Sequence, residues 1–382
     1  MTLKNIILLG ATGSIGNSTL KLIRQKRDEF NLIGISAYSN VDQLKMIANE
    51  FEVKNICYFK NNTNTDFAND INITVGEKGL LELAALKCDL VVSGISGLAG
   101  LMPTLEALNN GNNIAIANKE PLVVAGKILK ETSKKNNAKI LPVDSEHNSI
   151  FQCFSENHRK NISHITLTAS GGPFLNRPIE KFKNITLKEA LNHPTWEMGK
   201  KVSIDSATLI NKALEIIEAG FLFELSSEQI EVVIHPESII HGLVHYKDGS
   251  VLANLGLPDM ISPLSVAIGY PKRYNLELPK LDLASVSKLN FLKPDLKKFP
   301  GLQYGWEALN GPDYVSIVLN ASNEVAVNMF LNNRINFNNI IEIIDSSLNN
   351  NTFTNPKNLG DILEIDSITR NFAKKVSENF YD

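Results

Sequence analysis

Carboxylates at two places in the sequence have the spacing expected of ligands for a divalent cation. Asp144 and Glu146 follow the apolar run Ile140–Val143, and residues two apart in an extended chain point to the same side. Glu215, further along the chain, offers a third carboxylate in a segment with helical spacing. Hard oxygen ligands of this kind suit Mg²⁺ or Mn²⁺ and not zinc. The alternative is that these acids are solvated in a loop and on the outer face of a helix.

Small polar residues around Glu215 are of the types that bind phosphate. Asp205 or Ser206 is the expected N-cap of a helix. Asn211 and Glu215, four residues apart, lie on one face of that helix. The loop Ser170-Gly171-Gly172-Pro173 follows an expected strand at 164–168 and has a backbone open to an anion. The candidate phosphate ligands are therefore Ser206, Asn211, Lys212 and the loop that begins at Ser170.

The segment His193-Pro194-Thr195-Trp196-Glu197-Met198-Gly199 has the composition of a loop but carries a histidine and an aromatic ring. Such a loop could close over a ligand with Trp196. Equally, Trp196 could pack onto the core. The remaining histidines His235, His241 and His245 occur in strand-like sequence without a supporting cysteine, which favours a structural role over a metal site.

A glycine-rich turn, Gly10-Ala11-Thr12-Gly13-Ser14-Ile15-Gly16, follows the first apolar run and opens a helical pattern. Gly10 permits a tight turn, Gly13 lets backbone N–H groups approach a pyrophosphate, and Gly16 allows close helix–strand contact. The unpaired N–H groups at the start of a helix then face the anion. In this strand–turn–helix context the motif predicts dinucleotide binding, and a plain tight turn is the alternative.

The end of the second expected strand bears on the choice of cofactor. Its residues Ser36-Ala37-Tyr38-Ser39-Asn40 lack the acid that would bind the ribose of NAD, which favours NADP. They also lack a lysine or arginine that would bind a 2′-phosphate directly.

The elements that must position these residues follow from the hydrophobic pattern. In residues 1–143, β-branched runs alternate with helical spacing, which predicts a doubly wound (Rossmann-like), mostly parallel α/β sheet. The expected strands are Asn5–Leu9, Leu32–Ala37, Lys54–Phe59, Asn72–Val75, Leu90–Ser93, Asn113–Ala117 and Lys139–Val143.

The rest of the chain changes character. Residues 144–269 predict a central α+β catalytic domain whose strands look antiparallel, with a hairpin of Gly242–Tyr246 and Ser250–Leu255. Residues 270–300 are rich in proline and lysine and predict a linker. Residues 301–382 have helical spacing and predict a C-terminal helical bundle.

Composition narrows the class of protein. The 382 residues carry 38 basic and 41 acidic side chains, so a net charge of −3 gives no case for nucleic acid or an anionic membrane as partner. Three separated cysteines exclude a disulfide scaffold and suit a reducing cytoplasm. No Walker-type phosphate loop and no G-x-S-x-G nucleophile motif occurs.

Taken in order, these motifs resemble the 1-deoxy-D-xylulose 5-phosphate reductoisomerase family over essentially the whole chain. The stretches that carry the resemblance are GATGSIG from Gly10, ANKE from Ala117, PVDSEH from Pro142, TASGGPF from Thr168, HPTWEMGKK from His193, SIDSATLINKALE from Ser203 and LNASNEVAV from Leu319. The visible departure is at Tyr38-Ser39, where many members have glycine followed by lysine or arginine. The departure leaves the 2′-phosphate contact open.

The resemblance implies a role for individual residues. The implied NADPH-binding residues are Thr12, Gly13, Ser14, Ile15, Ala37, Ser39, Asn40, Asn118, Glu120 and Gly199. The implied ligands of Mg²⁺ or Mn²⁺, with Co²⁺ as a further candidate, are Asp144, Glu146 and Glu215, which count as catalytic together with Lys119 and His193. The implied substrate contacts are Lys119, Ser145, Glu146, Ser170, His193, Trp196, Met198, Ser206, Asn211, Lys212 and Glu215, with a mobile lid near 193–200.

The resemblance also implies a reaction. The family rearranges and reduces 1-deoxy-D-xylulose 5-phosphate to 2-C-methyl-D-erythritol 4-phosphate in isoprenoid precursor biosynthesis, and the expected assembly is a cytoplasmic homodimer. Two other classes remain open at this point. A plain NADP-linked dehydrogenase would not need three metal-binding carboxylates, and a non-catalytic nucleotide sensor would have no use for a phosphate cradle.

Overall fold

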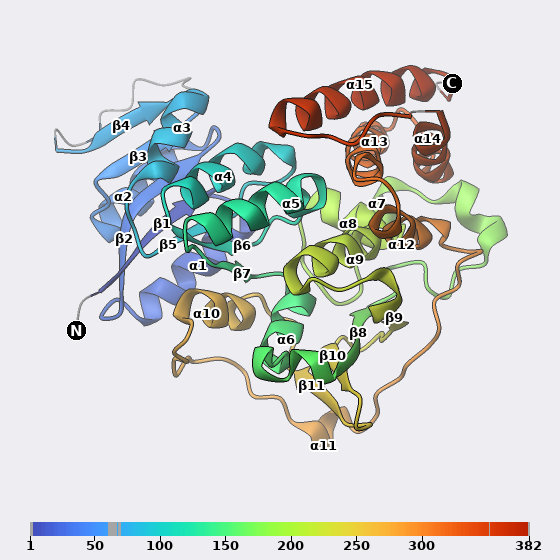
Figure 1. Cartoon of the computed structure of the whole chain (residues 1–382), viewed down its shortest axis with the longest axis horizontal. Helices are drawn as coiled ribbons and strands as arrows, with labels where there is room; N and C mark the ends of the chain where they lie inside the picture. Colours follow the sequence, from blue (N-terminus) through green and yellow to red (C-terminus); the bar gives the residue numbers. More distant parts are fainter. Residues whose placement is uncertain (1–2, 60–66, 68–69, 351, 381–382) are drawn as a thin grey trace. The chain divides into compact units, whose positions relative to one another are not determined.

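The computed structural model describes residues 3–59, 67, 70–350 and 352–380 and divides the chain into two compact units (Figure 1). Unit 1 comprises Met1–Pro121, Lys127–Asn148 and Asp259–Pro279. Unit 2 comprises Leu122–Gly126, Ser149–Pro258 and Lys280–Asp382. Within the described residues, no helix is long and apolar enough to cross a membrane.

Unit 1 is built on a seven-stranded parallel sheet with the order β4-β3-β2-β1-β5-β6-β7. Its strands are β1 (Lys4–Leu9), β2 (Phe30–Ala37), β3 (Asn55–Tyr58), β4 (Asn72–Val75), β5 (Leu90–Ser93), β6 (Asn113–Ile116) and β7 (Ile140–Pro142). The predicted doubly wound sheet and all seven predicted strands are confirmed. The strand order reverses between β1 and β5, the place where open α/β sheets bind ligands.

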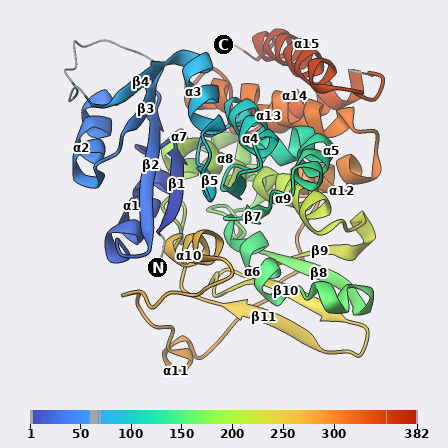
Figure 2. The same ribbon diagram turned by 60° about the vertical axis from the view of Figure 1, so that its left-hand side comes forward.

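The helices of unit 1, apart from α10, follow its parallel strands in the chain. They are α1 (Ser14–Gln25), α2 (Val41–Phe51), α3 (Gly76–Ala85), the 3₁₀ turn η1 (Leu98–Gly100), α4 (Leu101–Asn109), α5 (Glu120–Lys135) and, from much later in the chain, α10 (Ile261–Gly269). Figure 2 shows α10 beside α1, and the Lys4 ammonium donates to the carbonyl of Ile268 at 2.6 Å.

Buried apolar runs explain why these strands are central. The side chains of Ile6–Leu9 and Leu90–Val92 are fully buried, as expected of strands with helices on both faces. Close contact between sheet and helix also depends on Gly16 in α1. A Cβ atom at this position would lie 2.3 Å from the carbonyl oxygen of Ala11. Only glycine therefore fits where the first turn of α1 packs against the turn that follows β1.

Unit 2 contains a four-stranded mixed sheet with the order β11-β10-β8-β9. Its strands are β8 (Ile162–Ala169), β9 (Ile230–Ile234), β10 (Ile240–Tyr246) and β11 (Val251–Leu255). The predicted hairpin of β10 and β11 is confirmed, and β10 also pairs antiparallel with β8. The pairing of β8 with β9 is parallel, contrary to the antiparallel appearance of the sequence, because the chain returns between them through a helical crossover.

That crossover and the end of the chain supply most helices of unit 2. The helices are α6 (Ser145–Cys153, which begins in unit 1), α7 (Leu187–Leu191), α8 (Lys200–Ala207), α9 (Ile210–Phe223), α11 (Leu283–Val286), α12 (Gln303–Asn310), α13 (Tyr314–Leu331), α14 (Phe337–Asn350) and α15 (Leu359–Glu378). Short 3₁₀ turns are η2 (Glu156–Asn161), η3 (Ile179–Asn184), η4 (Ser227–Gln229) and η5 (Pro300–Leu302). The predicted C-terminal helical region is confirmed by α12 to α15.

The packing at Gly16 makes a prediction about stability. Gly16→Ala should lower the free energy of unfolding by about 1–3 kcal/mol, the usual cost of forcing extra volume into a packed site. Urea denaturation measures this loss. Gly13→Ala is the matched control, because a Cβ there would meet only the Gly10 carbonyl at 3.4 Å. Equal losses in the two variants would contradict the argument.

Candidate active site

The glycine-rich turn of unit 1 presents the start of α1 to solvent. Gly13 is the N-cap of α1, and both Gly13 and Ser14 are exposed, while Thr12 and Ile15 are half-buried. The neighbouring strand fixes the turn, since the buried Ser36 hydroxyl accepts from the Gly10 N–H at 3.1 Å. The turn can therefore offer backbone donors to an anion.

The end of β2 lies beside this turn, as the β1–β2 pairing requires. Ala37 is buried, whereas Tyr38, Ser39 and Asn40 are exposed. Asn40 is the N-cap of α2, and its side chain accepts from the Gln43 N–H at 3.2 Å. The structure thus brings the candidate pyrophosphate and adenosine residues together at one edge of the sheet.

Three buried polar residues follow β6. Asn118 donates to the Gly97 carbonyl at 2.7 Å, and Glu120 begins α5. Lys119 lies between them, and its ammonium is 2.6 Å from a carboxylate oxygen of Asp144, which follows the adjacent strand β7. Burial would raise the pKa of Asp144, but Lys119 and then His147 outweigh it and hold that pKa well below its usual range. Asp144 is therefore ionised without a bound metal.

The local structure at Asp144 differs from the extended chain expected from the sequence. Helix α6 begins at Ser145, so Glu146 lies in its first turn and not two positions along a strand. Oxygens of Asp144 and Glu146 nevertheless lie within 4.8 Å of each other. The Ser145 hydroxyl donates to Glu146 at 2.5 Å. Unit 1 thus supplies two neighbouring carboxylates, suitable as hard ligands.

Unit 2 holds the third candidate carboxylate. Glu215 in α9 is 1% exposed, and both the Asn211 amide and the Lys212 ammonium donate to it. Each carboxylate oxygen accepts one hydrogen bond from the preceding turn of the same helix, and each keeps a lone pair that can bind a cation. Glu215 is therefore not a solvent-facing acid.

The expected single helix around these residues is in fact two helices. Asp205 and Ser206 lie inside α8 and are not N-caps. The chain breaks at Leu209, whose φ of 59° is left-handed, and α9 begins at Ile210. The prediction was wrong because the Asp205 side chain does not cap a helix. Its carboxylate accepts from Lys201 in the same helix at 2.8 Å and from Asn323 of α13 at 2.9 Å.

The Ser-Gly-Gly loop packs directly against α8. A Cβ on Gly172 would lie 2.7 Å from the Ser206 carbonyl oxygen, and the φ of Gly172 is +67°. This close approach places the loop that carries Ser170 beside the helix that carries Ser206. The candidate phosphate residues of unit 2 therefore come from adjoining segments.

His193 has a defined tautomer. Its Nδ1 accepts from the backbone N–H groups of Thr195 at 3.2 Å and Trp196 at 3.0 Å. The neutral ring must then carry its proton on Nε2, which donates to the Ser170 hydroxyl oxygen at 3.0 Å. Burial lowers the pKa of His193 to about 4. Ser170 Oγ also accepts from the Gly172 N–H at 3.2 Å, which leaves its own hydrogen to donate outward.

The segment that follows His193 is partly buried. Trp196 and Met198 are half-buried, and the Trp196 ring meets the buried His241 ring edge-on at a centroid distance of 5.9 Å. Gly199 is exposed and is the N-cap of α8. Trp196 is therefore neither a core residue nor fully solvated.

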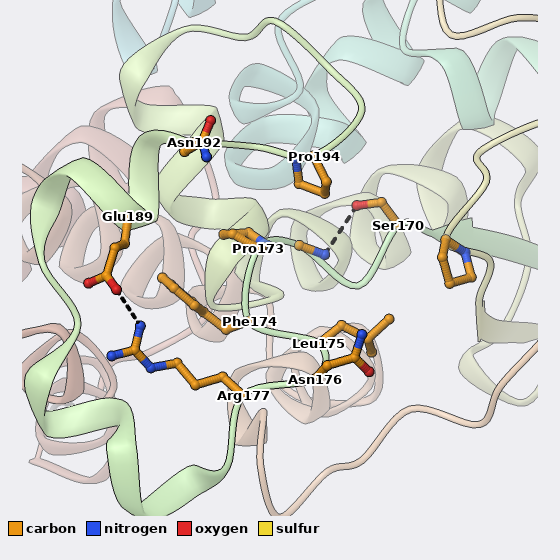
Figure 3. A pocket seen from close by; sticks show the side chains of 11 residues that line it. Ser170, Pro173, Phe174, Leu175, Asn176, Arg177, Glu189, Asn192 and Pro194 are labelled. Atoms are coloured by element: carbon orange, nitrogen blue, oxygen red, sulfur yellow. Dashed lines mark hydrogen bonds and ion pairs between the residues drawn. The ribbon is translucent and has the colours of Figure 1, made fainter.

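A cavity of about 480 Å³ opens beside Ser170 in unit 2 (Figure 3). One wall is the loop from Ser170 to Arg177, and the other runs from Glu189 to Pro194. Arg177 and Glu189 join the two walls by an ion pair of 2.8 Å.

The same Glu189 completes a capping box with Thr186 at the start of α7. Hydrogen bonds from Thr186, followed by Arg177, lower the pKa of Glu189 to about 2. Helix α7 is thus anchored just before His193.

The histidines set aside as structural behave as expected. His235 is fully buried, with Nδ1 2.8 Å from the Asn290 carbonyl and Nε2 accepting from the Ile239 N–H. His245 pairs with the Thr166 hydroxyl at 2.9 Å.

Sequence reasoning missed the residues that support the candidate ligands from behind. These are Ser36, His147, Lys201 and Asn323. All four lie in stretches quoted in the sequence analysis: the segment from Ser36 to Asn40, PVDSEH, HPTWEMGKK and LNASNEVAV. Those stretches did not identify the partners that these residues hold.

The strand–turn–helix at Gly10, the carboxylates with lysine partners and the serine-rich loop together are typical of NAD(P)-linked oxidoreductases that act on phosphorylated substrates. Comparison with known proteins identifies the family. The chain matches the family described as 1-deoxy-D-xylulose 5-phosphate reductoisomerase over residues 6–126, its C-terminal domain over 140–223, and a further DXP reductoisomerase C-terminal domain over 255–372. The chain belongs to the 1-deoxy-D-xylulose 5-phosphate reductoisomerase family.

Relatives that match the chain over nearly its whole length are also reductoisomerases. The chain is 46% identical to the reductoisomerase of Geobacillus sp. (strain WCH70), covering 98% of this chain and 100% of that protein. It is 44% identical to that of Thermoanaerobacter pseudethanolicus, covering 98% and 99%.

Solved structures of the family have the same fold. The Zymomonas mobilis enzyme in complex with NADPH superposes with a TM-score of 0.93 at 37% identity, covering 99% of this chain and 100% of that one. A DOX-P reductoisomerase in complex with NADPH, fosmidomycin and magnesium gives 0.94 at 42% identity, covering 98% of each.

The chain is accordingly an NADP-dependent oxidoreductase and isomerase. With NADPH and a divalent metal it converts 1-deoxy-D-xylulose 5-phosphate to 2-C-methyl-D-erythritol 4-phosphate, a step of isoprenoid precursor biosynthesis.

The tautomer of His193 makes a prediction about pH. Because the pKa is about 4 in the folded chain against 6.5 ordinarily, the folded state binds fewer protons between these values. The contribution of His193 to the free energy of unfolding should therefore be complete above pH 6.5 and fall as the pH drops toward 4. A histidine NMR titration, assigned with His193→Asn, measures the pKa directly. Titration near 6.5, or a proton on Nδ1, would refute the assignment.

Proposed function

We propose that Asp144, Glu146 and Glu215 coordinate the divalent cation. The proposal is supported separately in each unit. Asp144 is ionised and has Glu146 as a near neighbour, and Glu215 is a buried carboxylate. Each of Asp144 and Glu215 has a lysine partner in its own unit, Lys119 and Lys212. These residues fit a Mg²⁺ or Mn²⁺ ion, because the donors are hard oxygens and no sulfur ligand is near them in sequence.

We propose that the substrate phosphate binds to Ser170, Ser206, Asn211 and Lys212. The observation that carries this assignment is the approach of the Gly172 backbone to Ser206, which joins the serine loop to α8. Ser170 donates its hydroxyl hydrogen, since its lone pairs accept from His193 and Gly172. Binding the phosphate away from the reacting carbons provides interaction energy that orders the rest of the site.

NADPH binds at the edge of the unit 1 sheet in this proposal. The backbone of residues 12–15 holds the pyrophosphate at the start of α1, and Ala37, Ser39 and Asn40 surround the adenosine ribose. Asn118, Glu120 and Gly199 border the remainder of the cofactor. The arrangement is supported by the exposed turn at Gly13 and Ser14 and by the absence of an acid at the end of β2.

Each residue proposed to line the site has a separate role in the reaction. When bound, the divalent cation polarises the substrate carbonyl and NADPH supplies hydride. Lys119 donates to a substrate oxygen and keeps Asp144 ionised. Ser145 and Glu146 orient the substrate hydroxyls, and the neutral His193 holds Ser170 in a donating orientation. Trp196 and Met198 cover the substrate and exclude water.

Residues 193–200 act as the lid in this scheme. One end of the segment follows the anchored helix α7, and the other is the exposed N-cap Gly199. The half-burial of Trp196 supports a covering role that depends on the state of the site.

The four segments of the sequence have separate duties in this proposal. Residues 1–143 bind NADPH, and residues 144–269 bind the metal and the substrate. Residues 270–300 are the linker to the supporting helical domain, which comprises residues 301–382. In the structure α12 to α15 belong to unit 2, with α13 packed on α8.

We also propose that the protein is a cytoplasmic homodimer. The edge strand β11 exposes Val251, Leu252 and Leu255, and an exposed apolar edge is a template for pairing with a second copy. The free cysteines Cys57, Cys88 and Cys153 fit a reducing compartment.

The metal assignment predicts the behaviour of Glu215→Gln. The substitution keeps shape and helix propensity but removes an anionic ligand. Turnover of the pentulose phosphate, followed by NADPH absorbance with Mg²⁺, should fall at least 100-fold. The loss of a residue that only supports a metal ligand already costs about 10–100-fold in metal affinity or activity, and the loss of a ligand itself should cost more. Mn²⁺ binding measured by electron paramagnetic resonance should weaken in parallel.

The exposed Glu224→Gln, on the turn that ends α9, is the control and should change neither quantity. Near-normal turnover of Glu215→Gln at ordinary Mg²⁺ concentrations would show that Glu215 is not a ligand of the cation. Metal-independent turnover by the unmodified chain would instead favour a plain dehydrogenase.

The lid assignment predicts that Trp196→Ala impairs catalysis with little loss of thermal stability. The reason is that Trp196 is only half-buried. Trp196→Phe should restore part of the turnover, because it retains an aromatic cover. Steady-state kinetics and a melting curve check both statements. A large drop in melting temperature with intact turnover would show that Trp196 is a core residue.

A further inference from the structure

The short helix α8 carries Ser206 but has little stability of its own. It spans only Lys200–Ala207, and an isolated helix shorter than about 12–15 residues is marginal in water. The five successive residues from Val202 to Ser206 are all of types with moderate to low helix propensity. The position of Ser206 therefore depends on the segments against which α8 packs.

Asp205, next to Ser206, ties α8 to a helix that is distant in the sequence. It is 1% exposed, and each of its carboxylate oxygens has a separate donor. Oδ2 accepts from the Lys201 ammonium, one turn earlier in α8, at 2.8 Å. Oδ1 accepts from the side-chain amide of Asn323 in α13 at 2.9 Å. Because a buried carboxylate must keep its donors, α8 cannot turn or slide on α13 without a large loss of free energy.

The environment of Asn323 indicates that its role is this contact with Asp205. Asn323 is fully buried, and its amide oxygen has no hydrogen-bond partner among the residues that the structure describes. A buried polar atom without a partner costs free energy, so an apolar side chain of the same shape would suit the packing of α13 alone better. An apolar side chain could not donate to Asp205. Asn323 therefore serves the position of α8 more than the stability of its own helix.

A rotation of α8 would displace two parts of the proposed phosphate site at once. Successive residues of a helix differ by about 100° around its axis, so the rotation that directs Asp205 to α13 also sets the direction of Ser206. The Gly172 backbone packs on the peptide that follows Ser206: a Cβ at Gly172 would lie 2.7 Å from the Ser206 carbonyl oxygen and 3.3 Å from the Ala207 Cα. The loop that carries Ser170 is therefore placed by the same helix.

We propose that Asp205, fixed by Asn323, is a positioning residue for the substrate phosphate. The inference rests on the proposed phosphate site and gives α13 a part in substrate affinity. Asp205 sets the rotation of α8, and Ser206 and the serine loop then contact the phosphate together. The charge of Asp205 would repel a phosphate if it were unpaired, but the Lys201 ammonium offsets it locally.

The test compares Asn323→Leu with the unmodified enzyme, both with NADPH and Mg²⁺. The substitution keeps the size and shape of the side chain but removes the donor to Asp205. The KM for 1-deoxy-D-xylulose 5-phosphate should rise about 10-fold to 100-fold, the loss expected for one hydrogen bond to a charged group. The inhibition constant of inorganic phosphate, which probes the phosphate site alone, should rise by a similar factor. The kcat and the dissociation constants of NADPH and Mn²⁺ should stay within about threefold, because the lost interaction acts on substrate binding.

Two comparisons separate positioning from a general loss of structure. Ser322→Ala is the matched control, because Ser322 is equally buried in α13 but its hydroxyl donates within that helix, to the carbonyls of Val318 and Leu319. It should leave KM and the phosphate inhibition constant unchanged, whatever its effect on the melting temperature. A double-mutant cycle combines Asn323→Leu with Ser206→Ala. Because the first substitution acts through Ser206, the double variant should lose much less affinity than the two single losses combined.

The outcomes are separable from those of the proposed function. An unchanged KM in Asn323→Leu, or independent losses in the double-mutant cycle, would overturn the positioning role while the phosphate site stands. If Asn323→Leu does not fold, Asn323→Ala removes the same donor and should show the same rise in KM. Failure of both variants to fold would show that Asn323 serves the fold and not the site, which also overturns the proposal. An unchanged KM in Ser206→Ala alone would instead overturn the assignment of Ser206 to the phosphate.

Discussion

A carboxylate removed from water must keep a cation or several hydrogen-bond donors beside it, and each unit of this chain meets that requirement from its own residues. Lys119 neutralises Asp144 in unit 1, and Lys212 with Asn211 neutralises Glu215 in unit 2. An unpaired buried charge would cost several kcal/mol, roughly 3–5 when one partner is lost. Lys119 thereby holds the pKa of Asp144 below its usual range, and Lys212 lies against the second of the two acids proposed to bind the metal.

The helical end of the chain contributes to the site although it carries none of the proposed ligands. Asn323 of α13 donates to Asp205, which fixes α8 and with it Ser206. Helix α12 packs on α9 so closely that a Cβ on Gly305 would lie 2.6 Å from the Ala213 carbonyl oxygen. Helices α8 and α9, which carry Ser206 and Glu215, are thus packed against segments more than 80 positions away in the sequence.

Local patterns were enough to predict much of this architecture. The strand–turn–helix at Gly10 and the alternation of apolar runs depend on neighbours in sequence, and both are present in the structure. The break at Leu209 and the parallel pairing of β8 with β9 were not predicted. Both features involve contacts between residues distant in sequence. Asp205, inside α8, accepts a hydrogen bond from Asn323 of α13, and β9 pairs with β8 only after the helical crossover between them. The identities of candidate ligands could be predicted, but the residues that orient them could not.

The anchored helix α7 changes the entropy of the segment that follows it. Ordering a free loop costs about 1–2 kcal/mol for the backbone of each residue, which for residues 193–199 would consume most of the interaction energy of a small sugar phosphate. Here Glu189 fixes the start, α8 fixes the end, and the His193 ring already holds the backbone of Thr195 and Trp196. Few torsions remain to be ordered. In the proposed scheme, in which this segment covers the substrate, a ligand with only a handful of polar atoms can therefore order the loop and still be released afterwards.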